Sequence, residues 1–253
     1  MIFDTHAHYD DKRFDCDRDA LLGGLPNRGV GLVLNPGCDL KSSKAALDMA
    51  SRYSHVFAAV GVHPHEAKYL TPEWLSFFGQ AHSKRVAIGE IGLDYHYDHS
   101  PRDVQISAFR AQMELASGLK LPVIIHDREA HEDTLRVLRE FPDVCGVLHC
   151  YSGSREMAKI LVQLGYYIGF TGALTFKNAR RAVEVAQWLP EERILLETDC
   201  PYMTPEPHRG KRCDSSFLPL VATRLAEIRG VDAEHIVGVT EKNGRVLFGI
   251  ERV

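Results

Sequence analysis

The sequence predicts an α/β fold, a (β/α)8 barrel of the TIM type that forms one domain over residues 1–253. The chain has 253 residues, a common length for such barrels. Short apolar runs alternate with helical stretches along it, which indicates a parallel sheet. Ligand-type side chains close several of these runs, and a barrel would gather them at one mouth. A doubly wound open sheet with fewer strands is the alternative.

Eight apolar runs are the candidate strands. They are Ile2–His8, Val30–Leu34, Val56–Val62, Val86–Glu90, Val123–His126, Val144–His149, Tyr166–Thr171 and Ile194–Asp199. Several are almost continuously apolar, as parallel strands buried on both faces should be. Because helical stretches separate them, eight such strands favour the barrel over the open sheet.

The helical stretches are recognised by their caps and by the spacing of apolar residues. Thr71 has the side chain of an N-cap, and Pro72 suits the first helical position. Gly118 suits a C-cap at the end of its stretch. The candidate helices are Leu21–Arg28, Ser42–Tyr53, a helix begun by Thr71 and Pro72, Arg102–Gly118, Glu132–Glu140, Arg155–Leu164, Ala179–Leu189, Leu218–Arg229 and Thr240–Phe248.

The charge balance limits the kinds of partner that the protein can bind. The chain carries 30 basic and 34 acidic side chains, a net charge of −4 with neutral histidines. A protein that coats nucleic acid over its whole surface is usually basic. A polyanionic substrate must therefore be held locally, and the 13 histidines favour metal ions as the means.

The cysteines and the first residues bear on the compartment. The six cysteines form no CxxC pair, so we expect free thiols rather than a structural zinc site. The start of the chain, MIFDTHAHYDD, lacks the basic and apolar regions of a signal peptide. No apolar run approaches the ~20 residues that span a bilayer. We expect a soluble cytoplasmic protein with no membrane partner, a monomer being one possible state.

His6 and His8 carry the sharpest local signal for a metal site. Alternate residues of a strand point to the same side, so both imidazoles would face the barrel interior and chelate one ion. Imidazole suits zinc, and added carboxylates extend the range towards manganese and magnesium. Taken alone, such a pair is more often ordinary surface or core histidine.

Four further ligand-type residues close later strands: Glu90 the fourth, His126 the fifth, His149 the sixth and Asp199 the eighth. Each alone is more often a hydrogen-bonded core residue, a helix cap or a solvated acid. Packing alone does not explain why all of these residues fall at the same end of their strands. Several charges would then be buried without partners, which is costly. The pattern therefore predicts a metal centre, in which Glu90 could bridge two ions and Asp199 could also orient or deprotonate a water.

Other polar residues near the predicted mouth are candidates for substrate binding. The segment Pro205–Arg212, PEPHRGKR, follows the eighth strand, where loops of this fold often bind phosphate. Its Arg209 and Lys211 could contact phosphate oxygens, although the spacing alone slightly favours a solvated basic loop. His63 lies just past the third strand and is either a pocket ligand or phosphate contact, or part of a rigid turn with Pro64.

Six segments, taken in chain order, resemble those of a known family. They are FDTHAHYD (Phe3–Asp10), GVHPH (Gly61–His65), IGEIGLDYHY (Ile88–Tyr97), PVIIHDREA (Pro122–Ala130), LHCYSG (Leu148–Gly153) and ETDCPYMTPEPHRGKR (Glu197–Arg212). The sequence resembles the TatD family of metal-dependent deoxyribonucleases, within the amidohydrolase-like barrels. The resemblance runs from the first strand to the last and covers essentially the whole chain.

The resemblance implies a dinuclear centre for two divalent ions, magnesium, manganese or zinc. The ligands that it implies are His6, His8 and Asp199 for one ion, His126 and His149 for the other, and Glu90 as the bridge. It also implies 3′→5′ exonuclease activity on single-stranded DNA, and sometimes RNA. Some relatives look like deacylases of misacylated tRNA.

Two features separate the chain from related sequences. After RGKR the family usually continues with an Asn and a nearby Pro, whereas Cys213–Ser216 follows here. We expect this loop to shape the substrate pocket and its change to alter substrate preference. Phosphotriesterase-like barrels bridge their metals with a modified lysine, and Glu90 at that place argues against the lactonase and phosphotriesterase branch.

The working hypothesis is two-metal hydrolysis of a phosphodiester bond, with Asp199 and Glu90 as the catalytic carboxylates and Asp199 as proton acceptor. A metal-dependent amide or ester hydrolase that acts on a small molecule or an aminoacyl-tRNA is the second hypothesis. A non-catalytic metal-binding protein is the third, and it is disfavoured because structural metal sites normally have closed coordination.

The expected substrate is the end of a single DNA strand. Arg209 and Lys211 would steady the strand, and Tyr95 and Tyr151 are candidates for base stacking. A chain with a net charge of −4 has little electrostatic reach along DNA, so a strand end is favoured over a wrapped duplex.

Overall fold

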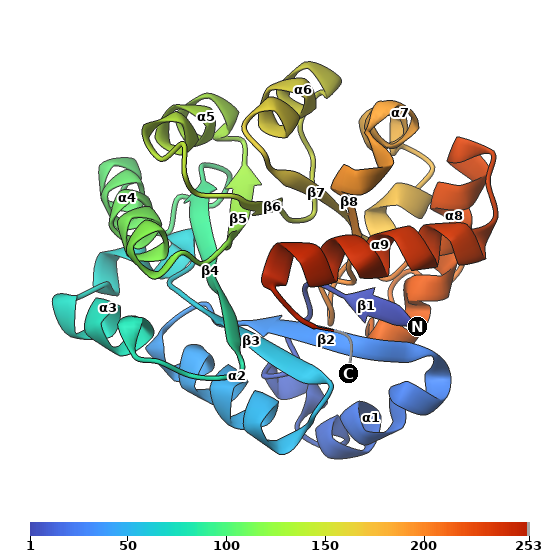
Figure 1. Cartoon of the computed structure of the whole chain (residues 1–253), viewed down its shortest axis with the longest axis horizontal. Coiled ribbons are helices and arrows are strands. Elements are labelled where there is room, and N and C mark those ends of the chain that lie inside the picture. The colour runs from blue at the N-terminus through green and yellow to red at the C-terminus, as the bar shows by residue number, and fades with distance from the viewer. Residues whose placement is uncertain (252–253) are drawn as a thin grey trace.

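The computed structural model describes residues 1–251, and eight parallel strands in these residues pair in chain order, each with the next (Figure 1). The strands are β1 (Ile2–Asp4), β2 (Val30–Pro36), β3 (Val56–Val60), β4 (Arg85–Asp94), β5 (Val123–Arg128), β6 (Gly146–Leu148), β7 (Tyr167–Phe170) and β8 (Ile194–Leu196). All eight predicted strands are present, several of them shorter than the apolar runs.

The first and last strands meet and close the sheet. The Thr5 N–H donates to the carbonyl of Leu196 (3.1 Å), and Ala7 forms a parallel bridge with Cys200 just beyond the two strands. This contact leaves the sheet without the two open edges of a doubly wound fold. The (β/α)8 barrel predicted from the sequence is confirmed.

The described chain has nine α-helices, of which α1 to α8 lie around the barrel and α9 crosses one end of it (Figure 1). They are α1 (Arg18–Gly24), α2 (Leu40–Arg52), α3 (Pro72–Gly79), α4 (Arg102–Leu119), α5 (His131–Glu140), α6 (Arg155–Gln163), α7 (Arg180–Trp188), α8 (Leu218–Arg229) and α9 (Ala233–Phe248). Thr71 caps α3 as predicted, because its side chain accepts from the Trp74 N–H. Within residues 1–251, no helix combines the length and apolar character needed to cross a membrane.

Helix α4 continues past the predicted C-cap Gly118, and Lys120 is its C-cap instead. Two further helices differ from the sequence prediction in their bounds. The predicted helix Leu21–Arg28 starts earlier, as α1, and breaks before Pro26, which begins a short 3₁₀ turn because proline has no N–H to continue the helix. The last helix starts at Ala233 rather than Thr240. The Thr240 hydroxyl donates back to the carbonyl of Ile236 (2.8 Å), so it lies inside the helix instead of capping it.

Helix α9 packs across the N-terminal end of the barrel (Figure 1). Phe248 at its end meets Phe3 of β1 edge to face, with ring centroids 6.0 Å apart. The same cluster includes Leu34, Ile124 and Leu195 from three other strands, so the barrel interior is filled with side chains at this end. The C-terminal end of the barrel is the end left for a site.

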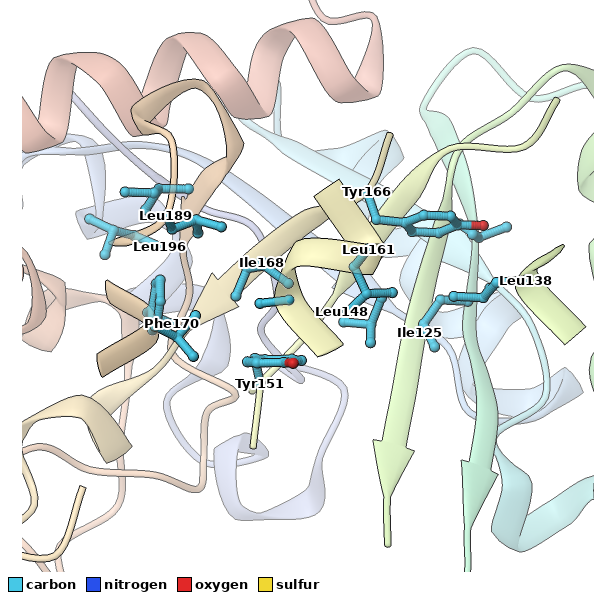
Figure 2. Packing of buried hydrophobic residues seen from close by; sticks show 14 of the residues in the cluster. Ile125, Leu138, Leu148, Tyr151, Leu161, Tyr166, Ile168, Phe170, Leu189 and Leu196 are labelled. Atoms are coloured by element: carbon cyan, nitrogen blue, oxygen red, sulfur yellow. The ribbon is translucent and has the colours of Figure 1, made fainter. Parts of the chain in front are cut away.

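A second apolar layer lies between the strands and the helices. Figure 2 shows Leu148 and Ile168 of neighbouring strands near Leu161 of α6, and Leu138 of α5 beside Ile125 of β5. Burying each such side chain is worth about 1.5–3 kcal/mol. This packing fixes the strands, so that the residues just beyond β6 and β7 are held in place.

All six cysteines are free thiols, as expected. Cys38 and Cys150 lie close to the residues described next, whereas Cys16 and Cys145 are exposed.

Candidate metal centre

The six predicted ligands come together at the C-terminal end of the barrel, although none of them is the last residue of a strand. His6 and His8 follow β1, which stops at Asp4, and Asp199 follows β8. His149 comes directly after β6, and His126 lies in β5. Glu90 lies inside β4, which continues to Asp94, so the prediction that it closes its strand is wrong.

His6 and His8 form one side of the cluster. Their Nε2 atoms lie 3.0 Å apart, and each lies close to Glu90 Oε2, at 3.4 Å and 3.5 Å. Asp199 Oδ1 lies 3.8 Å from Nε2 of His6 and 3.6 Å from Nε2 of His8. Two imidazoles and two carboxylates therefore present their free atoms to a common space.

His126 and His149 form the other side of the cluster. His126 Nδ1 lies 2.9 Å and His149 Nε2 lies 2.8 Å from Glu90 Oε1. His63 reaches the same oxygen, with its Nε2 at 3.5 Å, and only 8% of the residue is exposed. The structure thus places His63 beside the clustered ligands. Its Nδ1 also accepts from the His65 N–H at the start of the turn with Pro64, so features of both sequence alternatives are present.

The donor set fits divalent metal ions. Three groups of ligand atoms lie within 4.8 Å of one another: His6 with His8 and Glu90, His6 with His149 and Asp199, and His63 with Glu90 and His126. Glu90 belongs to two of these groups through different oxygens. Imidazole nitrogen with carboxylate oxygen suits zinc and manganese, and the carboxylates admit magnesium.

Charge in the centre is arranged around Glu90. Burial opposes its ionisation, but the facing histidines, led by His149 and His63, outweigh burial and hold the pKa of Glu90 well below its usual value. Burial raises the pKa of Asp199, partly opposed by His149 and His8. Glu90 is therefore an anion at neutral pH, and Asp199 is the more basic of the two carboxylates.

Asp94 is a buried residue that the sequence analysis missed. Its Oδ2 accepts from Nε2 of His65 (2.9 Å) and of His126 (3.1 Å). Burial opposes ionisation, but these hydrogen bonds and others outweigh it and lower the pKa of Asp94. The predicted strand stops at Glu90, and following the apolar run Ile91–Leu93 to its end would have found Asp94.

Glu197 is the second buried acid that the analysis missed. Its Oε1 accepts from the Cys150 N–H and lies 3.9 Å from Nδ1 of His149. Burial raises the pKa of Glu197 to about 8. A Cβ at Gly169 would lie 2.4 Å from Glu197 Oε2, so only glycine there leaves space for the carboxyl group. The raised pKa of Glu197 could not be predicted from the sequence. The groups around its carboxyl group follow β6 or belong to β7, far from Glu197 in the chain.

The predicted phosphate contacts lie on the loop after β8. Arg209 and Lys211 are both exposed, and the Arg209 guanidinium covers the ring of Phe176 at 3.9 Å from its centroid. This stacking holds Arg209 against the loop that follows β7. Arg212 in the same segment is instead paired with Asp17.

The two tyrosines predicted to stack on bases are engaged elsewhere. Tyr151 is 7% exposed, donates to the carbonyl of Ser154 (2.7 Å) and packs in the apolar layer (Figure 2). Tyr95 is half-buried, donates to Asp133 (2.6 Å) and has the Arg102 guanidinium over its ring. The burial of Tyr151 and the contacts of Tyr95 both disfavour a stacking role.

The loop Cys213–Ser216 is held by buried hydrogen bonds. Ser215 is buried, and its hydroxyl donates to Asp4 Oδ2 (2.7 Å) beside the hydroxyl of Tyr9 (2.8 Å). Asp214 accepts from the Ser216 N–H and so begins a 3₁₀ turn. The hydrogen bond from Ser215 ties the loop to Asp4, the last residue of β1, and indicates a structural role for Ser215. The expected effect of the loop on substrate preference stays a prediction.

Residues 3–249 match a protein family described as TatD related DNase. The chain belongs to the TatD family. It is 41% identical to the uncharacterized metal-dependent hydrolase YabD of Bacillus subtilis, over 99% of this chain and 100% of that protein. It is 34% identical to the 3′-5′ ssDNA/RNA exonuclease TatD of Salmonella typhimurium, over 98% and 99% of the two chains.

Solved structures of the TatD family have the same fold. The chain matches YjjV, a TatD homolog from Escherichia coli K12, with a TM-score of 0.92 and 32% identity over 99% of this chain and 98% of that one. The TatD family match and the clustered histidines and acids identify the protein as a metal-dependent hydrolase that acts on ester bonds.

Proposed function

We propose that this protein is a 3′→5′ exonuclease that cleaves phosphodiester bonds of single-stranded DNA, and of RNA, with two divalent metal ions. The position of Glu90 carries the proposal. One of its oxygens faces His6 and His8, and the other faces His126 and His149. A carboxylate placed between two sets of ligands is what a bridged pair of ions requires.

The proposed ligand sets follow these two sides. They are His6, His8 and Asp199 for the first ion, His126 and His149 for the second, and Glu90 for both. His63 is close enough to Glu90 and His126 to add a ligand to the second. Magnesium, manganese or zinc bound here would polarise the phosphoryl group and make a nearby water more acidic.

Asp199 is the proposed proton acceptor. Its side chain is 14% exposed, so water can reach it, whereas Glu90 is almost completely buried. The raised pKa of Asp199 makes it the better base of the pair. Glu90 stays ionised and holds the two sides of the centre together.

A nucleic-acid end is the proposed substrate for three reasons. A relative 34% identical to this chain is named a 3′-5′ ssDNA/RNA exonuclease. Exposed Arg209 and Lys211 on the loop after β8 can contact backbone phosphates. The net charge of −4 disfavours a long electrostatic footprint, which a strand end does not need.

The test uses single-stranded oligonucleotides labelled at either end, with magnesium, manganese or zinc added to metal-free protein. A 3′→5′ exonuclease shortens the 5′-labelled strand stepwise and releases the 3′ label first. RNA, duplex DNA, esters, lactones and an aminoacyl-tRNA are compared in parallel. The proposal fails if only the esters or the aminoacyl-tRNA react, or if activity survives chelation or the pair Glu90→Ala and Asp199→Ala.

A further inference from the structure

Asp94 is held by hydrogen bonds to both oxygens of its carboxylate and to its backbone. It is fully buried, and its Oδ1 accepts from the backbone N–H of His96 (3.0 Å) and of Tyr97 (2.9 Å). Gln105 fixes its backbone, because the Asp94 N–H donates to Gln105 Oε1 (2.8 Å) and Gln105 Nε2 donates to the Asp94 carbonyl (3.1 Å). The carboxylate therefore cannot turn without breaking several hydrogen bonds.

The remaining oxygen of Asp94 lies between two imidazoles. Oδ2 is 3.1 Å from Nε2 of His126 and 2.9 Å from Nε2 of His65. An ionised carboxylate only accepts hydrogen bonds, so both Nε2 atoms must carry a proton. In neutral His126 this leaves Nδ1 without a proton, and Nδ1 is the atom that faces Glu90 Oε1 at 2.9 Å.

We propose that Asp94 is a positioning residue for the second ion: it fixes His126 as the Nε2–H tautomer, with the lone pair of Nδ1 directed into the metal centre. This inference rests on the proposed ligand sets. A partner behind a ligating imidazole sets its tautomer and orientation, and losing one typically costs 10–100-fold in metal affinity. Asp94 contacts neither His6 nor His8 in the hydrogen bonds that fix it, so the effect belongs to one side of the centre.

The substitution Asp94→Asn tests the inference with almost no change of volume. The amide oxygen must take the place of Oδ1, because the N–H groups of His96 and Tyr97 both donate there. The amide NH2 then faces His126 and donates to it. Nε2 of neutral His126 must accept, which moves the proton to Nδ1 and blocks the lone pair.

The measurement is metal titration against a chelating dye, with manganese and with zinc. We expect Asp94→Asn to lower the affinity for the second ion about 10–100-fold and to leave the affinity for the first ion nearly unchanged. Asp98→Asn is the matched control, because it makes the same exchange at an acid paired only on the surface with Arg102. His65→Ala removes the other imidazole and should cost much less than Asp94→Asn.

A second readout needs no change at Asp94. Nitrogen-15 NMR of histidine-labelled, metal-free protein reports which ring nitrogen carries the proton, at a pH where His126 is neutral, and His126→Gln assigns the signal. Protonation at Nε2 is expected. Protonation at Nδ1 in the unaltered protein, equal weakening of both ions by Asp94→Asn, or no weakening at all would overturn the inference. Neither readout uses a substrate, so failed cleavage of oligonucleotides refutes the exonuclease proposal alone.

Discussion

The imidazole rings of His6 and His149 stack with centroids 3.9 Å apart and planes 8° from parallel. The two residues arrive from opposite parts of the chain, after β1 and after β6. Burial first, and then the neighbouring charge of His149, lower the pKa of His6 well below its usual value. The lowered pKa keeps His6 neutral, so the stack does not place two cations together, and the Glu90 carboxylate lies against both rings.

Glu90→Gln should therefore remove metal from both sides of the centre. The amide keeps the volume but loses the charge and one acceptor, so we expect metal affinity and hydrolysis to fall by more than about 100-fold, since losing a partner behind a ligand already costs 10–100-fold. Metal content by elemental analysis and turnover of an oligonucleotide are the measurements. Glu132→Gln, an exposed acid in the first turn of α5, is the control. Full metal occupancy in Glu90→Gln would contradict the bridging role.

Removal of metal should lower thermal stability. A ligand present at a free concentration of about 100 times its Kd stabilises the native state by about 2.7 kcal/mol. For a chain of this size, 1 kcal/mol corresponds to about 2–4 °C in Tm, so chelation should lower Tm by roughly 5–10 °C. Calorimetry with and without chelator measures the shift, and re-addition of metal should reverse it. An unchanged Tm in protein shown to have held metal would count against a site formed only on folding.

The sequence predicts the barrel well because each strand is a local apolar run. His6 and His8 are recognisable because their spacing combines with ligand-type residues near the ends of later strands. Asp94 is not, because its role depends on β4 lying unusually close to β5. Gly92 permits this approach with a φ of 135°, and a Cβ there would lie 2.0 Å from the carbonyl oxygen of His126.

The role of Ser215 could not be predicted from the sequence for a different reason. Its partner Asp4 is separated from it by almost the whole chain. The resemblance to the family showed only that the residues after RGKR differ from the usual ones. Tyr151 shows the converse: a tyrosine beside a ligand suggests substrate contact, and only packing reveals that it is buried. Long-range contacts and burial decide these roles.

Ser215→Ala should destabilise the protein and leave the chemistry unchanged. Burial raises the pKa of Asp4 to about 6, and the Ser215 hydroxyl is one of the donors that oppose this rise. Losing a donor to a buried polar group costs about 1–3 kcal/mol. Urea unfolding measures the loss, and kcat of the folded enzyme should stay within twofold, roughly the spread of a neutral surface change. Ser216→Ala is the neighbouring control. A changed substrate preference in Ser215→Ala would assign a pocket-shaping role to Ser215.

Arg209→Ala combined with Lys211→Ala should raise KM for oligonucleotides with little effect on kcat. Each phosphate contact to a single strand contributes about 0.7 to the slope of log affinity against log salt, so the slope should fall by roughly 1.4. Binding of an uncleaved strand at several salt concentrations gives the slope. Lys242→Ala, on α9 at the far end of the barrel, is the control. An unchanged slope would mean that this loop is only a solvated basic segment.

Metal affinity should rise with pH because His126 must give up a proton to bind an ion. Burial lowers the pKa of His126, but hydrogen bonds to Asp94 and Glu90 outweigh burial and raise it to about 9 in the metal-free protein. Below pH 9 the ion therefore displaces at least one proton, and affinity should increase about tenfold per pH unit per proton released.

Titration of His126 has the opposite effect on the stability of the metal-free protein: stability falls as pH rises. A histidine whose pKa is raised on folding stabilises the protein fully below its unfolded value of about 6.5, and this contribution is lost as pH rises to about 9. Metal-free protein should thus become less stable over that window while metal binding becomes tighter, so the stabilisation by metal must grow with pH. Titration calorimetry in buffers of different ionisation enthalpy counts the protons released when metal binds. A metal affinity independent of pH between about 6.5 and 9 would show that His126 binds no ion.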